Sequence, residues 1–376
     1  MTANCLARMT TRVTICASLL TFATAILPFI VAQPLSAQDE TTLSIDHTGP
    51  GTRGASTVSA SAFHIKLAAT DAVRSHPVSR VQGATSKVPR AVAAPQAAAG
   101  VALSSVPPPG FYPDDLTYFG GPTLTQMESN NIYVNKQSCG SIRTCWGNPS
   151  RFLRDLNRST FIRLTDQYTG TRGSYEVGDS VSARVTPVPT LLGTQTTQDI
   201  TQDQIVALVH DAASEIGTGY GHEYHVFLPA GIDTCFPGNQ VCYSPDSPST
   251  FFFCAYHGSI DFTDIGHVLV SVEPYQNVTG CQAVPPNPNG ALADSTNSVL
   301  SHELIESITD PDPGSGWVAV NSLIALGAEI GDLCEPVGLS CLNNVYFCDS
   351  NVSLNNHSYE IQLEYSNTYH ACAAGP

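Results

Sequence analysis

The clearest helical pattern along the chain lies between Thr201 and Gly217. Apolar residues recur there at spacings of three and four, which places them on one face of a helix. Thr201 followed by Gln204 has the form of a capping box, and Gly217 is a typical stop residue. We therefore predict an amphipathic helix between these two ends.

A second helix is predicted from Asp294 or Ser295, either of which can cap it. It ends before Pro311 and Pro313, which cannot continue a helix. The apolar residues of its buried side are Val299, Leu300, Leu304, Ile305 and Ile308.

Runs of aromatic and β-branched residues predict strands around these helices. The runs are residues 131–134, 224–228, 251–255, 268–272, 345–347 and 359–365. Together the patterns predict an α+β fold, a single mixed helix and strand domain over residues 109–376.

The segment 38–108 has a different composition. It is rich in Ala, Ser, Val, Thr and Pro and has few large apolar residues. Such a segment buries too little surface to offset the entropy of ordering it. We predict a disordered linker or a pro-segment.

The first residues predict export. Arg8 and Arg12 precede an apolar run over 13–32, and small residues follow at Ser36 and Ala37. This order is typical of a secretory signal peptide over residues 1–37, with an uncleaved signal anchor as the alternative. We expect a secreted or extracellular protein, with periplasm and cell wall as possible locations and no membrane association after cleavage.

Cysteine usage agrees with export. Ten cysteines follow the signal, an even number that predicts a fold stapled by up to five disulfide bonds. Cys139 with Cys145, and Cys235 with Cys242, are close enough to close small loops. A structural zinc site is the competing use, but the chain has no C-x-x-C pair.

Charge is distributed unevenly. The chain has 16 basic and 32 acidic residues, a net charge of −16, and every Lys and Arg lies before residue 185. Residues 185–376 hold 21 acids and eight of the 11 histidines. Nucleic acid and anionic membranes are thereby excluded as partners, because both need a basic surface. The excess of acidic residues favours a cation as the binding partner. The alternative is that it adapts the protein surface to an extracellular medium.

The second predicted helix carries the sequence His302-Glu303-x-x-Glu306. Residues four apart share a helix face, so His302 and Glu306 can hold one metal ion. Glu303 is rotated by about 100° from His302 and can act as general base on a water bound to that ion. This is the zincin pattern with Glu in place of the second His, and we expect the fold to be zincin-like around this helix. Zn²⁺ or another divalent cation is the expected cofactor.

A third ligand is expected from the downstream segment that contains Glu329 and Asp332. Glu329 is the first choice, and Asp332 is an orienting residue or a substitute ligand. The alternative is an ordinary amphipathic helix with exposed acids, followed by an acidic loop.

Upstream histidines can bind or polarise a substrate opposite the metal. His257 stands out because it ends a predicted buried strand, and the adjacent Tyr256 can stabilise an oxyanion. For each of His222, His225, His257 and His267 taken alone, a hydrogen-bonded structural role is the favoured interpretation.

Several blocks resemble the phosphate-induced/EXORDIUM family of secreted proteins. They are Tyr118-Phe119-Gly120-Gly121-Pro122, Phe253-Cys254-Ala255-Tyr256-His257, Ser301-His302-Glu303-Leu304-Ile305-Glu306 with Asp310-Pro311, Glu329-Ile330-Gly331-Asp332-Leu333-Cys334-Glu335, and the C-terminal Cys372-Ala373-Ala374-Gly375-Pro376. The chain departs from the family in its Cys235–Cys242 loop and long N-terminal segment. The resemblance implies an extracellular or cell-wall protein linked to growth and nutrient response, and it implies no particular reaction.

Three hypotheses for function follow. The first is a secreted zinc-dependent hydrolase of the metallopeptidase type that acts on a peptide or cell-wall-type extracellular substrate. The second is a non-catalytic extracellular interaction protein with a structural cation. The third is a glycosidase that uses Glu303 and Glu329, which requires the two carboxyl groups to flank a sugar.

Overall fold

The computed structural model describes residues 42–47, 60–69, 112–157, 159–170, 175–189, 198–321, 328–334 and 349–376, the first two ranges by their backbone alone. Outside the described residues lie the predicted signal peptide, the predicted strand 345–347, and two of the ten cysteines that follow the signal, Cys341 and Cys348.

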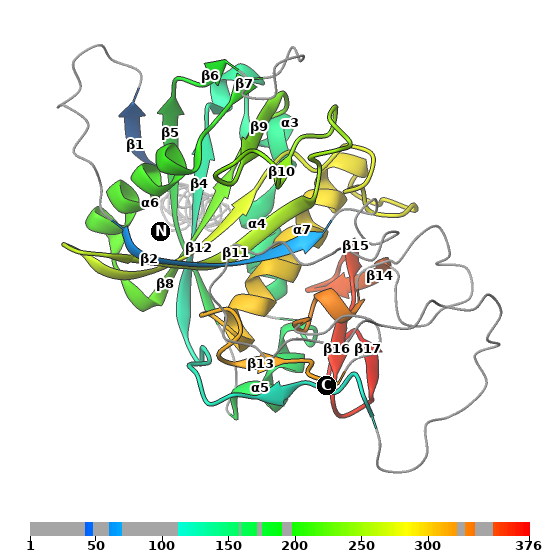
Figure 1. Ribbon diagram of the computed structural model, residues 1–376. Helices are drawn as coiled ribbons and strands as arrows, with labels where there is room; N and C mark the ends of the chain where they lie inside the picture. The colour runs from blue at the N-terminus through cyan, green and yellow to red at the C-terminus, as the bar shows by residue number, and fades with distance from the viewer. Residues whose placement is uncertain are drawn as a thin grey trace, which may run out of the picture. The chain divides into compact units, whose positions relative to one another are not determined.

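A seven-stranded sheet forms the centre of the fold (Figure 1). Its strands, in spatial order, are β1 (Thr42–His47), β5 (Tyr175–Val185), β4 (Met127–Val134), β8 (Gly219–Phe227), β12 (Gly266–Glu273), β11 (Phe253–Phe262) and β2 (Ala60–Ala69). The first five are parallel, and β11 is antiparallel to both of its neighbours.

The two edge strands come from the segment for which the sequence predicted no regular structure. β1 pairs with β5, and β2 pairs with β11 along most of its length. Edge pairing is made by backbone hydrogen bonds, which composition does not reveal. The rest of residues 38–108 lies outside the described residues.

Helix α6 (Gln202–Ile216) covers the apolar face of the sheet. It begins with the predicted capping box between Thr201 and Gln204, which is therefore confirmed. The helix packs in one apolar cluster with strand residues such as Tyr224, Val226 and Val270. Because side chains alternate along a strand, their sequence neighbours point to the opposite face.

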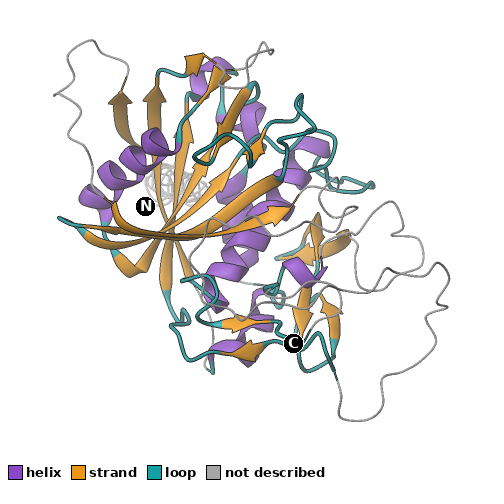
Figure 2. Ribbon diagram, viewed as in Figure 1, coloured by secondary structure: helices purple, strands orange, loops and turns teal. Residues whose placement is uncertain are grey.

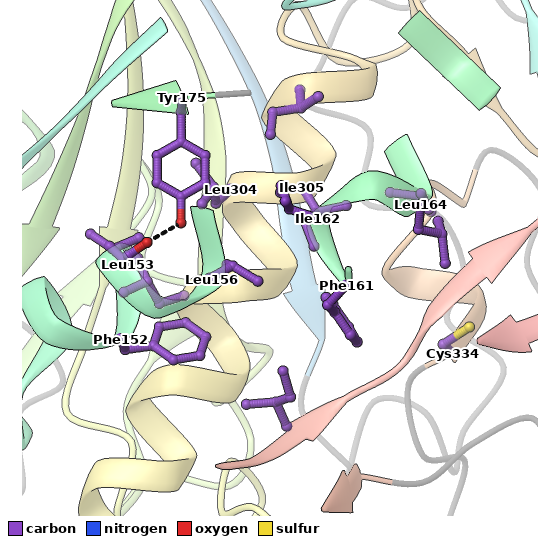
Figure 3. Packing of buried hydrophobic residues seen from close by; sticks show 14 of the residues in the cluster. Phe152, Leu153, Leu156, Phe161, Ile162, Leu164, Tyr175, Leu304, Ile305 and Cys334 are labelled. Atoms are coloured by element: carbon purple, nitrogen blue, oxygen red, sulfur yellow. Dashed lines mark hydrogen bonds between the residues drawn. The ribbon is translucent and has the colours of Figure 1, made fainter. Parts of the chain in front are cut away.

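Helix α7 (Ala291–Thr309) lies on that opposite face, where it contacts β11 and β12. It begins after Gly290, earlier than the predicted cap at Asp294 or Ser295. The apolar side of α7 packs against α4 (Pro149–Asn157) and the segment after it. Figure 3 shows Leu304 and Ile305 facing this apolar cluster.

Smaller elements surround the two helices (Figure 2). A four-stranded sheet has the order β10 (Cys242–Tyr243), β9 (Ile232–Cys235), β7 (Gln198–Asp199), β6 (Val188–Pro189). Three strand pairs are β3 (Thr117–Tyr118) with β13 (Trp317–Val318), β14 (Asp349–Leu354) with β15 (His357–Gln362), and β16 (Glu364–Ser366) with β17 (Ala371–Ala373). Short helices are η2 (Lys136–Ser138), α3 (Ile142–Trp146), η3 (Ile162–Thr165), α5 (Asp166–Thr169) and η4 (Asp332–Cys334).

Among the described residues, disulfide bonds link the chain at four places. They join Cys139 to Cys145, Cys235 to Cys242, Cys254 to Cys281, and Cys334 to Cys372. The prediction of a mixed helix and strand fold stapled by disulfides is confirmed. Within the described residues, no helix is long and apolar enough to cross a membrane.

Candidate metal centre

The face of the sheet that meets α7 is polar and buried. A row of polar side chains runs in register across four strands. It consists of His257 on β11, Ser271 on β12, His225 on β8 and Asn131 on β4. These four side chains are at most 1% exposed. Buried polar groups need partners, so this layer is held together by hydrogen bonds and charge rather than by apolar packing.

Two groups of side chains between α7 and its neighbours could hold a metal ion. One consists of His257, Glu303 and Glu306, and the other of His302, Glu306 and Asp332. Within each group, one ligand atom per residue lies within 4.8 Å of the others. Glu306 belongs to both groups.

In the first group, His257 Nδ1 lies 3.2 Å from Glu303 Oε2 and 3.3 Å from Glu306 Oε2. The other ring nitrogen, Nε2, lies 3.4 Å from the carbonyl oxygen of Asp310 and 3.5 Å from Glu329 Oε2. A metal-binding histidine normally donates its second ring N–H to a carbonyl or carboxylate. His257 has this arrangement, because Nδ1 faces the other two residues of the group and Nε2 faces the Asp310 carbonyl and the Glu329 carboxylate.

The second group is built in the same way. His302 Nε2 lies 3.2 Å from Glu306 Oε1, and His302 Nδ1 faces the side-chain amide of Gln362. Gln362 is fixed in turn by donating to the carbonyl oxygen of Gly331 at 2.7 Å. A Cβ at Gly331 would lie 2.5 Å from His302 Nδ1, so only glycine allows the downstream segment to approach this closely.

The structure brings the acids of the sequence motif together, with altered roles for three of them. Asp332, the substitute ligand, groups with His302 and Glu306. Glu329, the first choice, instead faces the outer nitrogen of His257. Glu303, predicted to stand apart from the ligands, lies in the group of His257.

His257 itself lies within β11 rather than at the end of a strand, because β11 continues to Phe262. The side chain of Tyr256 does not lie in this cluster. The Tyr256 hydroxyl donates to Gln202 Oε1 on α6, at 2.6 Å. Consecutive strand residues point to opposite faces, so Tyr256 lies on the α6 side of the sheet and His257 on the α7 side.

The electrostatics of the first group depend on a proton at His257. Burial lowers the pKa of His257, but Glu329, Glu303 and Glu306 together raise it well above its usual value. Burial raises the pKa of Glu306, whereas the two histidines outweigh it and hold that pKa well below normal. The imidazolium thus takes the place of a cation among the carboxylates.

Two further buried acids were missed by sequence analysis. Glu223 on β8 accepts a hydrogen bond from Ser307 of α7 at 2.6 Å, and Glu273 on β12 accepts one from Ser271 at 2.9 Å. Both are fully buried, and burial raises both pKa values. Each acid lies one residue outside a predicted strand, 224–228 or 268–272, and the available signal was the alternation of polar and apolar residues that continues past the ends of these strands.

Glu223 makes stability depend on pH. Burial raises its pKa from 4.5 to about 8, so the folded protein holds a proton there that the unfolded chain loses. The contribution of Glu223 to the free energy of unfolding is therefore largest below pH 4.5. Between pH 4.5 and about 8 the free energy of unfolding falls by up to about 1.4 kcal/mol per pH unit, because only the unfolded chain loses this proton. Urea unfolding with chelator present should show a shallower decline for Glu223→Gln. Glu215→Gln, at an exposed position of α6, is the control. An equal decline in all three proteins would contradict the assignment.

Comparison with protein-family models, with curated proteins and with solved structures gives no match for this chain. The fold and site themselves define its class. It is a disulfide-stapled mixed α/β protein with a buried His and Glu cluster that could hold a metal ion.

Proposed function

We propose that the protein is a secreted, metal-dependent hydrolase of the peptidase type. The observation that carries this proposal is that candidate ligand atoms of His302, Glu306 and Asp332 lie within 4.8 Å of one another, with Glu303 next to His302 on the helix. Two carboxylates and one imidazole suit Zn²⁺, and other divalent cations are compatible with the same ligands.

A divalent cation held there would lower the pKa of a bound water toward neutrality. Glu303 is the residue suited to take the proton. Its Oε2 faces His257, whereas its Oε1 is buried without a hydrogen-bond partner among the described residues. Burial raises the pKa of Glu303, which brings this carboxylate closer to the range of an effective general base.

His257 and Glu329 act in this proposal as positioning residues. The His257 ring lies between Glu303 and Glu329, with one nitrogen toward each carboxylate. The same arrangement argues against a glycosidase, because the imidazole occupies the space that a sugar would need between the two acids.

Chelation tests the proposal directly. Hydrolysis of casein and of a peptide library should fall to background after treatment with a chelator and return on adding Zn²⁺. The metal content is measured in the same samples, with His267→Ala as a control whose histidine lies outside both groups. Hydrolysis that survives complete metal removal would overturn the proposal.

A non-catalytic protein with a structural cation is the second candidate. It is favoured by the burial of the cluster, since Glu303 and Glu306 are 0% exposed and His302 only 1%. On this alternative, chelation would lower the melting temperature, and no hydrolysis would be found on either substrate.

We also propose a relationship to the phosphate-induced/EXORDIUM family. It rests on the sequence blocks around His302 and Glu329, which here belong to the candidate metal centre. An extracellular peptide or cell-wall-type substrate belongs to the same proposal. Four disulfides support an oxidising location.

A further inference from the structure

Glu306 presents its two carboxylate oxygens to different histidines. Oε1 lies 3.2 Å from His302 Nε2 and also accepts the backbone N–H of Asp332 at 3.1 Å. Oε2 lies 3.3 Å from His257 Nδ1. A carboxylate held in this way is placed to bind one cation through each oxygen.

We propose that the centre holds two divalent cations, bridged by the Glu306 carboxylate. One is bound by His302, Glu306 and Asp332, and the other by His257, Glu303 and Glu306. This inference rests on the proposed function for the first cation and adds a second ion that the His-Glu-x-x-Glu pattern does not imply.

The geometry favours two ions over one ion shared by both histidines. Each candidate group contains one histidine, and among the described residues none contains both. In each histidine, the ring nitrogen that points away from the candidate group has its own partners. These are Asp310 and Glu329 for His257, and Gln362 for His302. A ring whose second nitrogen is held from outside is oriented as a ligand, and both rings meet this criterion.

The charges favour two ions as well. The carboxylates that face the two groups are Glu303, Glu306, Glu329 and Asp332. When ionised they carry four negative charges, and no Lys or Arg occurs anywhere after residue 184. One divalent cation together with the His257 imidazolium leaves one of these charges unbalanced in a buried site, whereas two cations balance all four.

The unpartnered oxygen of Glu303 supplies an independent observation. Glu303 is fully buried, and its Oε1 has no hydrogen-bond partner among the described residues. Leaving such an atom without a partner is costly. With Oε2 used as a ligand of the second cation, Oε1 would remain available to accept a proton from a water that the cations activate.

Metal stoichiometry tests the inference. The full-length secreted protein, saturated with Zn²⁺ and then freed of excess, should contain two ions per chain by elemental analysis. His257→Ala and Glu303→Gln should each retain one ion, His302→Ala should retain one, and Glu306→Gln should retain none. The control His267→Ala should retain two. A single ion in the wild type that is lost in both His257→Ala and His302→Ala would overturn the bridged pair.

A second measurement needs no variant. The wild-type protein loaded with Mn²⁺ alone should give an electron paramagnetic resonance spectrum of two exchange-coupled ions, because one carboxylate joins them. Two uncoupled Mn²⁺ signals would refute the bridge. The outcomes also separate the proposals. One ion with hydrolysis overturns only the second cation, and two ions without hydrolysis overturn only the hydrolase.

Discussion

Glu303→Gln is expected to lower kcat/KM for peptide hydrolysis by about 10²–10⁴. The substitution keeps the size of the side chain but removes the group that accepts a proton from water. The ion bound by His302 should remain, because Glu303 is not in that group. Hydrolysis rates and Zn²⁺ content measured on the same preparations check both parts of this prediction.

Glu273→Gln is the matched control for this experiment. Glu273 is as deeply buried on the same polar layer, but it belongs to neither ligand group. Its substitution should leave the metal content unchanged and affect the rate far less. If Glu303→Gln and Glu273→Gln lowered the rate equally while both retained metal, Glu303 would have no special role as a base.

Replacing Cys334 and Cys372 by Ala is expected to lower the free energy of unfolding by about 4 kcal/mol. This disulfide closes the longest of the four loops, with a sequence separation of 38, and chain-entropy stabilisation grows with loop length. It also ties η4, which begins at Asp332, to β17. We therefore expect weaker Zn²⁺ binding together with the lower stability.

The disulfide between Cys139 and Cys145 provides the comparison. Its sequence separation is only 6, so its removal should cost about 2 kcal/mol. It joins two residues that belong to neither ligand group, and Zn²⁺ affinity should not change. Urea unfolding and Zn²⁺ titration of the two double variants measure both effects. Equal loss of Zn²⁺ affinity in both would argue against a role for the Cys334 linkage in placing Asp332.

The local elements of the site were predictable because local rules form them. The capping box at Thr201 and Gln204 is a contact between residues three apart, and it occurs as predicted. The proximity of His302 and Glu306 follows from helical spacing alone, and their side chains lie 3.2 Å apart in α7. Helix geometry determines such pairs before any tertiary contact forms.

Edge strands and strand lengths were less predictable. β2 belongs to a segment whose composition suggested disorder, and β11 extends to Phe262, well beyond the apolar run at 251–255. The extension is polar on the face toward α7, where His257 and Ser259 alternate with apolar neighbours. A strand that buries polar groups on one face does not have the composition expected of a buried strand.

By itself, the sequence determined the helix that carries His302, Glu303 and Glu306, and the excess of acid without basic partners that favours a cation. Only the tertiary structure decided which residues complete the centre. Strand register places His257 opposite Glu303, 46 residues away in the chain, and the close approach of Gly331 brings Asp332 rather than Glu329 to Glu306. Helical spacing is a property of neighbouring residues. Sheet register and loop packing depend on the whole chain folding, so no local pattern encodes them.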